Sequence, residues 1–431
     1  MTKNLTLRPG KPDGFRRPEN PSSRVSTTAL LGACCFFLST LEYMIPKPLP
    51  FLRIGLANMP LIVALDILSV KSFALLVFIK ILGQGLITGS LFSYVFMFSL
   101  GGTLASAAVM YALRRCLGAE RVGFIGTSVA GALLSNGVQL ALARAFIFGE
   151  GLQYIVPPFL GLGVFMGMAL GLFCEIFTAR SVWYRTCRGL SPALPGGPER
   201  PSPAPVLIGP ALPRENSGGK KGLVLPGRDL LFTGFIMMIA FLINPSTLTR
   251  GIQFLLFGLY ARLTGKKITP LSPLFIMAVI VFGNLLAPYG RVLAEFGPFR
   301  LTQGSLLSGV HKAITLEGLF FLSKAVIRAD LRFPGKFGFF IGESFRLFER
   351  LIEQKGRITR KHFIEGIDTL MAELSVEEAG GKPEEGNPLQ AAAGKPEVGA
   401  PPRRPLPGIL LLAGTLGLTL GLTLIGRFLD Y

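Results

Sequence analysis

Long uninterrupted apolar segments restrict the fold of this chain more than any other feature. A helix of about 17–25 apolar residues is long enough to cross the hydrocarbon core of a bilayer. Because these segments are continuous and do not alternate with polar residues, they predict membrane-spanning helices rather than the strands of a barrel. Six of them lie at 28–46, 54–70, 72–90, 92–113, 122–148 and 155–177.

Further apolar segments follow the first six. They occupy 229–244, 250–264, 271–288, 305–327 and 408–426. Half of the residues are hydrophobic and only 16% are charged, against about 25% in a soluble domain, which excludes a soluble cytosolic enzyme and a disordered chain. We therefore predict an all-α, polytopic helical membrane protein. It has a six-helix N-terminal bundle, a second block of about four spans with cytoplasmic amphipathic helices, and one C-terminal span.

Changes in composition divide the chain into parts. Segments rich in Pro, Gly and charged residues are typical of linkers. Apolar residues at helical spacing across 338–374 predict one or two amphipathic helices, and the alternative is a helix that lies on anionic lipid. The parts are a cytoplasmic basic arm at 1–25, a six-span membrane domain at 26–178, a linker at 179–228, a second membrane block at 229–330, cytoplasmic amphipathic helices at 331–375, a linker at 376–406 and a C-terminal transmembrane helix at 407–431.

The positive charge of the chain predicts its orientation. There are 44 Lys and Arg residues against 25 Asp and Glu, a net charge of +19. Much of the excess lies in short segments beside the apolar runs, where it predicts cytoplasmic loops and contact with lipid headgroups rather than with nucleic acid. If the chain crosses the membrane six times, then four times and then once, all of the basic segments fall on the same side of the membrane. We therefore predict a multi-pass protein of the plasma membrane with a cytoplasmic N-terminus.

Motifs of catalysis are missing from the sequence. There is no G-x-x-x-x-G-K-[ST] for nucleotide phosphates and no DDxxD pair that would hold Mg²⁺ on a diphosphate. Five cysteines without C-x-x-C spacing and two histidines form no metal-binding pattern. The sequence therefore predicts no catalytic residue, no metal and no cofactor. Any ATP that powers the protein is expected to bind to another subunit.

Polar residues lie inside the predicted spans of the first block. Ionisable groups at membrane depth are costly and commonly serve function. Asn136 and Gln139 are three residues apart, so they share one helix face and could line a cavity for a small polar molecule. One alternative is that Glu42, Arg53 and Arg144 reach the outer interface. Another is that the amides of Asn136 and Gln139 form hydrogen bonds between helices.

Two motifs in the first block point to a known family. The stretch Leu-Arg-Ile-Gly-Leu-Ala-Asn-Met-Pro occupies 52–60, and Ser-Val-Ala-Gly-Ala-Leu-Leu-Ser-Asn-Gly-Val-Gln occupies 128–139. Over about residues 25–178 the chain resembles the Gx transporter family, also labelled heptaprenyl diphosphate synthase component I. That family is similar to the substrate-binding components of energy-coupling-factor transporters, which are six-helix vitamin-binding proteins. The resemblance implies uptake of a vitamin or cofactor precursor.

The resemblance also implies where the small-molecule substrate is bound. It places the substrate between the spans, in contact with Asn58, Asn136 and Gln139. Arg53 and Glu42 are then expected near the entrance. A flat heterocycle such as a flavin or a thiamine precursor is suggested as substrate by analogy alone.

Small residues recur at helical spacing in two of the predicted spans. Gly163, Gly167 and Gly171 lie four residues apart in the sixth span, and such spacing allows close approach of helices. Ala29 and Ala33 show the same spacing in the first span. In the resembled transporters, a small-residue face on the first helix docks the coupling subunit, so the two alanines are expected to serve that role.

The second block resembles a shortened coupling subunit of the same transporter class. The resemblance covers 229–375 and rests on the stretch 289–324. Coupling subunits carry two Arg-centred motifs that insert into paired ATPases, and Arg328 and Arg346 are the counterparts here. This implies that the second block couples substrate transport to separate cytoplasmic ABC-type ATPases.

Two other functions remain open from the sequence. The chain could be a non-catalytic membrane accessory subunit of heptaprenyl diphosphate or quinone biosynthesis, with 338–374 recruiting a soluble synthase. It could instead be an ATP-independent transporter in which Asp66, Lys80 and Glu42 couple transport to an ion. The identity of the protein partner distinguishes the first of these from ATP-driven uptake.

Overall fold

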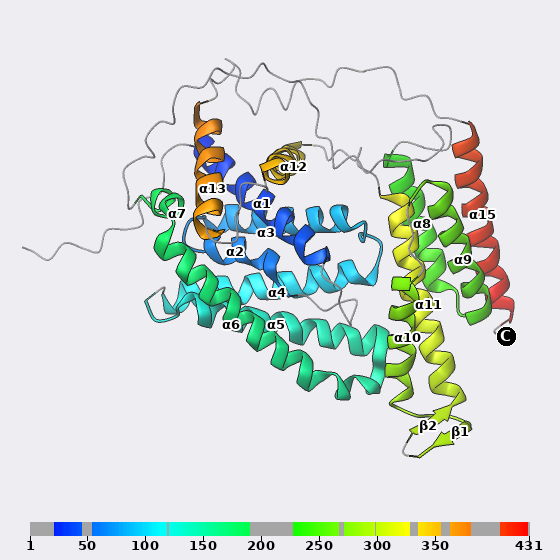
Figure 1. Cartoon of the computed structure of the whole chain (residues 1–431). Coiled ribbons are helices and arrows are strands. Elements are labelled where there is room, and N and C mark those ends of the chain that lie inside the picture. Colours follow the sequence, from blue (N-terminus) through cyan, green and yellow to red (C-terminus); the bar gives the residue numbers. More distant parts are fainter. Residues whose placement is uncertain are drawn as a thin grey trace, which may run out of the picture.

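The chain forms two helical blocks (Figure 1). The computed structural model describes residues 21–44, 54–118, 120–189, 227–266, 271–297, 299–327, 335–354, 363–380 and 406–429. The first block contains α1 (Pro21–Met44), η1 (Leu56–Asn58), α2 (Met59–Ala64), α3 (Val70–Thr88), α4 (Tyr94–Leu117), α5 (Phe124–Ala143), η2 (Arg144–Phe148), η3 (Gly149–Tyr154), α6 (Val156–Arg180) and α7 (Val182–Cys187).

The second block is built from the later part of the chain. It contains α8 (Gly227–Ile243), α9 (Thr247–Leu263), α10 (Leu271–Leu285), the antiparallel hairpin β1 (Val292–Phe296) and β2 (Phe299–Thr302), α11 (Gln303–Val326) and α15 (Leu406–Leu429). The helices α12 (Gly335–Gln354) and α13 (Phe363–Gly380) leave this block and pack on the first one (Figure 1).

The structure confirms an all-α membrane protein. Within the described residues, five helical stretches are long and apolar enough to cross a bilayer. They are α3, α4, the continuous stretch Phe124–Tyr154, α6 and α15. Shorter apolar helices occur at Thr27–Tyr43, Asp229–Ile243 and Leu271–Leu285. The two amphipathic helices expected within 338–374 are present as α12 and α13.

The segment 54–70 differs from its prediction as a span. Its helical part, η1 with α2, covers only Leu56–Ala64, and at 1.5 Å per residue it is far shorter than the hydrocarbon core. Gly55, at φ +87°, turns the chain just before it, and the side chain of Ser69 caps the start of α3. Every residue from Leu61 to Leu65 is buried, so the apolar run serves the core of the bundle rather than lipid.

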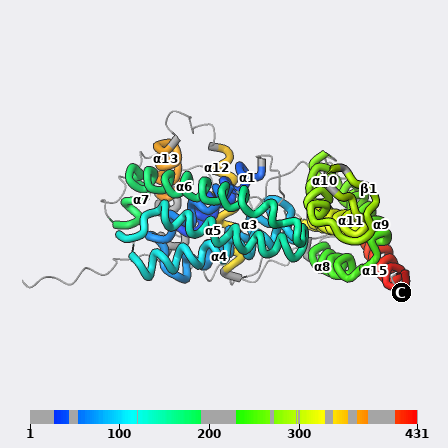
Figure 2. The backbone as a smooth tube through the Cα atoms, turned by 90° about the horizontal axis from the view of Figure 1, so that it is seen from below, coloured from blue at the N-terminus to red at the C-terminus, as the bar shows by residue number. Residues whose placement is uncertain are grey.

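The helices of the two blocks run crosswise. In Figure 1 the helices of the second block stand upright while α3, α4, α5 and α6 lie across the view. Seen from below in Figure 2, the upright helices appear end-on and the first block is still seen lengthwise. A single flat bilayer therefore cannot lie perpendicular to both sets of helices.

The first bundle is held by close contact between α5 and α6. Gly167 and Gly171 of α6 face the α5 backbone, where a Cβ at Gly167 would lie 3.0 Å from the Cα of Val129. Gly163 instead lies against the side chain of Asn136. The expected small-residue face is thus the face that α6 turns to α5.

Gly171→Ala should lower the free energy of unfolding by about 1–3 kcal/mol, as overpacking does in well-packed cores. Its Cβ would lie 2.9 Å from the backbone nitrogen of Ile125 and 2.9 Å from the carbonyl oxygen of Phe124. On the same helix, a Cβ at Gly161 meets nothing within 4 Å. Gly161→Ala should therefore be neutral or stabilise by up to about 1 kcal/mol through helix propensity. Thermal and denaturant unfolding in detergent compares the two variants, and equal stability would contradict close packing.

The amphipathic helix α12 packs its apolar face on α1. The ring of Phe36 lies 4.7 Å from that of Phe345 and 6.1 Å from that of Phe348, measured between centroids. Ala29 and Ala33 of α1 are fully buried in the same cluster. This apolar face of α12 is therefore covered by protein rather than turned to lipid.

The helix α13 is anchored to the first block through α7. The carboxylate of Asp368 accepts hydrogen bonds from the backbone N–H groups of Val182, at 2.9 Å, and Trp183, at 3.1 Å. The indole N–H of Trp183 donates to the hydroxyl of Ser375 at 2.8 Å. An acidic group at a helix N-terminus is favourable because the free N–H groups there carry partial positive charge. These contacts attach α13 to the first block, on which α12 also packs.

Candidate functional site

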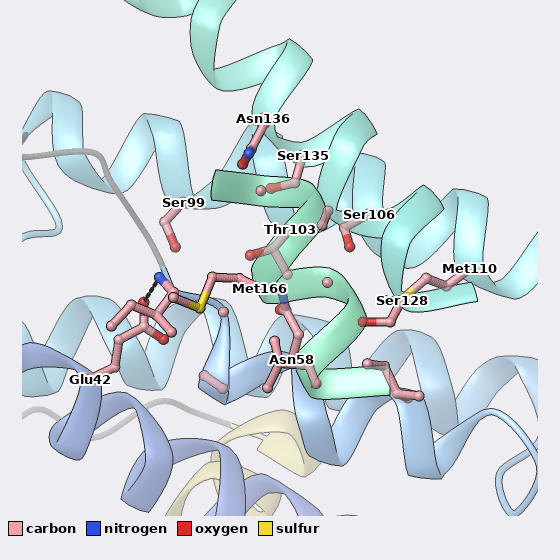
Figure 3. Close-up of a pocket in the computed structure, with 18 of the residues that line it drawn as sticks. Glu42, Asn58, Ser99, Thr103, Ser106, Met110, Ser128, Ser135, Asn136 and Met166 are labelled. Carbon is pink, nitrogen blue, oxygen red and sulfur yellow. Dashed lines mark hydrogen bonds between the residues drawn. The ribbon is translucent and has the colours of Figure 1, made fainter. Parts of the chain in front are cut away.

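A polar pocket lies inside the first bundle, between α1, η1, α2, α3, α4, α5 and α6 (Figure 3). Hydroxyl and amide side chains make up most of its polar lining, and one carboxylate and one ammonium group join them. The polar lining residues are Glu42, Asn58, Lys80, Gln84, Ser99, Thr103, Ser106, Ser128, Ser135, Asn136 and Gln139. So many polar groups at one place inside an apolar bundle mark the default candidate for a binding site.

Two helix faces supply all five hydroxyl groups of the described lining. Ser99, Thr103 and Ser106 follow each other at i, i+4 and i+7 along α4, and Ser128 and Ser135 are seven residues apart on α5. Positions at this spacing lie on one side of a helix. Sequence reasoning considered only amides and ionisable groups, so it missed these hydroxyls. The spacing within apolar runs was the signal that could have revealed them.

Hydrogen bonds between the lining residues order the pocket. The backbone N–H of Ile54 donates to the carboxylate of Glu42 at 2.9 Å. The ammonium group of Lys80 donates to the side-chain oxygen of Asn58. The side-chain amide of Asn136 donates to the carbonyl of Phe159 in α6 at 3.3 Å. Both charged groups of the pocket are thus engaged by protein atoms.

Two buried polar atoms of the pocket have no hydrogen-bond partner. They are the hydroxyl oxygen of Ser106 and the side-chain carbonyl oxygen of Gln139. The amide nitrogen of Gln139 does donate, to Ser135 at 2.8 Å. Buried polar groups in folded proteins are almost always satisfied, by protein or by a bound molecule. These two atoms are therefore free to accept a hydrogen bond from a water or a ligand in the pocket.

Four of the five residues expected to contact substrate come together in this pocket. Asn58, Asn136, Gln139 and Glu42 all line it, and all but Asn58 are buried. Arg53 lies outside the described residues. Glu42 is buried rather than placed at an interface. Of the two alternatives for the amides, the interhelical hydrogen bond is present for Asn136, which lines the pocket as well.

The other charged residues singled out in the sequence lie elsewhere. Arg144 forms an exposed ion pair with Glu150 at 2.8 Å. On α12, Arg346 pairs with Glu343 one turn earlier and stays partly exposed. Arg328 lies outside the described residues. Arg144 is therefore not among the lining residues of the pocket, and the partial exposure of Arg346 leaves it accessible to a partner.

Asp66 belongs to a structural cluster rather than to the pocket. Its carboxylate forms a buried ion pair with Arg114 of α4 at 2.7 Å and accepts a hydrogen bond from the hydroxyl of Tyr184 at 3.0 Å. Burial and the neighbouring carboxylate raise the pKa of Tyr184, so this hydroxyl stays protonated and donates. The cluster joins the turn after α2 to α4 and α7.

A second buried polar network lies in the second block. The guanidinium group of Arg250 donates to the ring nitrogen Nε2 of His311 at 2.6 Å and to the hydroxyl of Thr315 at 2.8 Å. It also donates to the backbone carbonyls of Leu242 and Asn244. These bonds join α8, α9 and α11. Among the described residues, no group of three or more His, Cys, Asp and Glu side chains could hold a metal ion.

Two known family models match the chain, one in each of the two blocks. Residues 31–177 match the family model described as heptaprenyl diphosphate synthase component I. Residues 230–329 match a model described as a domain of unknown function, DUF8519. No curated protein and no solved structure matches the chain. The first match contains every described residue of the polar pocket, and the second covers α8 to α11.

Proposed function

We propose that this chain is the membrane component of a small-molecule uptake transporter for a vitamin or cofactor precursor. The substrate binds in the polar pocket of the first bundle, with Asn58, Asn136 and Gln139 among its contacts and Glu42 at the α1 side. The second block and the amphipathic helices couple this bundle to separate cytoplasmic ABC-type ATPases. The chain itself performs no catalysis, and we place it in the plasma membrane with its N-terminus in the cytoplasm.

The observation that carries this proposal is the double role of α1. Near its C-terminal end, Glu42 lines the polar pocket. One to two turns earlier, Phe36 packs on Phe345 and Phe348 of α12. A helix that touches both the pocket and a partner-facing helix can transmit a displacement of one to the other, because packed interiors shift as units rather than deform.

The crosswise blocks support transport by reorientation. If the second block stands upright in the bilayer, the helices of the first bundle lie along it (Figures 1 and 2). Four of the five span-length stretches belong to that bundle, so an upright bundle would also suit the membrane. A bundle that alternates between these orientations would expose the pocket to each side in turn.

Copurification tests the proposed partners. Gentle purification of the full chain from its native membrane should recover two P-loop ATPases and a bound small molecule, both identified by mass spectrometry. Arg346→Glu, on the partly exposed side of α12, should reduce ATPase recovery at least fivefold, because it reverses the charge that the partner meets. Arg144→Glu serves as the matched control and should leave recovery unchanged, because Arg144 is also an arginine in an ion pair but lies in the first block, outside the proposed coupling parts. Equal recovery with both variants would remove Arg346 from the coupling surface.

A second candidate function is favoured by the family match. The description heptaprenyl diphosphate synthase component I fits a non-catalytic membrane accessory subunit. On that proposal, α12 and α13 recruit a soluble synthase to the membrane. The same purification distinguishes the two, because recovery of a prenyl synthase without ATPases or ligand would support the accessory role and overturn the transporter.

A further inference from the structure

Resting on the proposed uptake function, we infer that the polar pocket takes an uncharged, non-aromatic solute that carries several hydroxyl or amide groups. This narrows the substrate class and departs from the flat heterocycle suggested by analogy. The inference rests on the charge balance of the pocket, on the chemistry of its lining, and on the two unpartnered atoms.

The charges of the pocket favour a ligand without net charge. The described lining holds one carboxylate, Glu42, and one ammonium group, Lys80, so their charges cancel. Both are almost fully buried, and each is already hydrogen-bonded within the protein. A ligand with a net charge would remain uncompensated in a site of low dielectric, which is strongly unfavourable.

The remaining lining is suited to hydroxyl and amide groups. Five hydroxyl side chains line the pocket, namely Ser99, Thr103, Ser106, Ser128 and Ser135, and Figure 3 shows them around the cavity. A hydroxyl can both donate and accept, so it matches ligand hydroxyl and amide groups in either role. The unpartnered oxygen of Gln139 can only accept, so it favours a ligand that offers an O–H or N–H there.

The described lining offers no aromatic side chain against which a flat ring could stack. Among the described lining residues none is Phe, Tyr or Trp, and the larger apolar side chains are those of Ile54, Ile62, Met110, Met166 and Leu170. Proteins commonly hold flat rings by stacking or edge contacts with aromatic side chains. Polar groups here come from several helices around the cavity, an arrangement that fits a compact solute with donors and acceptors on all sides.

Binding of a defined mixture tests the inference. The purified full chain is incubated with myo-inositol, sorbitol and N-acetylglucosamine together with thiamine and riboflavin. Retained compounds are identified by mass spectrometry, and their effect on the unfolding temperature is measured. We expect retention of, and stabilisation by, the three non-aromatic compounds and neither effect from the two aromatic heterocycles.

Gln139→Met separates a binding role from a structural one. It should weaken binding about tenfold or more, because the ligand loses its acceptor. The unfolding temperature without ligand should change little, because losing the hydrogen bond from the Gln139 amide to Ser135 is offset by removing an oxygen that is buried without a partner. Gln153→Met, at an exposed position on η3, is the matched control and should change neither quantity.

Each of the other possible results would contradict a different part of the proposal. Retention of thiamine or riboflavin, lost in Gln139→Met, would overturn the solute class while leaving uptake through this pocket intact. Unchanged binding in Gln139→Met would overturn the assignment of Gln139 as a ligand contact and thereby the inference. Retention of nothing overturns the inference, and if native purification also yields no bound compound, the proposed function fails with it.

Discussion

Phe345→Ala should reduce substrate uptake at least tenfold while leaving substrate affinity unchanged. Phe345 is 3% exposed and its ring lies 4.7 Å from that of Phe36, so it forms the centre of the contact between α12 and α1. Removing a buried phenylalanine ring costs about 3–5 kcal/mol of packing, enough to release α12 from the bundle. None of the described lining residues of the pocket belongs to α12, so the pocket keeps all of them.

The matched control for Phe345→Ala lies on the same helix. Phe339 is 41% exposed, so Phe339→Ala should leave uptake within about twofold of the wild type, as surface substitutions commonly do. Uptake is measured in vesicles that contain the complete transporter, and affinity is measured on the purified chain in detergent. A Phe345→Ala variant with normal uptake, or one that loses affinity and uptake in parallel, would contradict coupling through this contact.

Asp66→Ala should lower the free energy of unfolding by about 3–5 kcal/mol, as removal of one partner from a buried ion pair does. The guanidinium group of Arg114 would lose the carboxylate that it meets at 2.7 Å, and both side chains are less than 10% exposed. The hydroxyl of Tyr184 would lose its acceptor at the same time. The connection between the turn after α2, the end of α4 and α7 would therefore weaken.

An exposed ion pair in the same bundle provides the comparison for Asp66. Arg144 and Glu150 also lie 2.8 Å apart, but their side chains are 63% and 74% exposed. Glu150→Ala should therefore cost no more than about 1 kcal/mol. Denaturant unfolding in detergent at neutral pH measures both variants. Similar losses for Asp66→Ala and Glu150→Ala would show that the Asp66 cluster is not a structural connection.

Much of the fold could be predicted from the chain because it depends on local properties. Hydropathy summed over about 20 residues decides whether a helix prefers the membrane, and this identified α3, α4, α5, α6 and α15. Helical spacing of apolar residues identified α12 and α13. Hydropathy failed at 54–70, because a buried core segment and a membrane span have the same apolar composition and only packing distinguishes them.

The candidate site was only partly predictable. Asn58, Asn136 and Gln139 stood out as polar residues within apolar segments, and the structure brings them into one pocket. The hydroxyls of α4 did not stand out, because serine and threonine are common in membrane helices and can bond to their own backbone. Thr103 and Ser106 gained significance only when α4 and α5 were seen to face the same cavity.

The sequence by itself determined that this chain is a helical membrane protein, and it singled out some of the polar residues that line the pocket. Only the tertiary structure decided that the two blocks run crosswise and that α12 packs on α1 (Figure 1). Local hydropathy and periodicity are properties of neighbouring residues. The contact of Phe36 with Phe345 depends on shape complementarity between segments far apart in the chain, which no local pattern encodes.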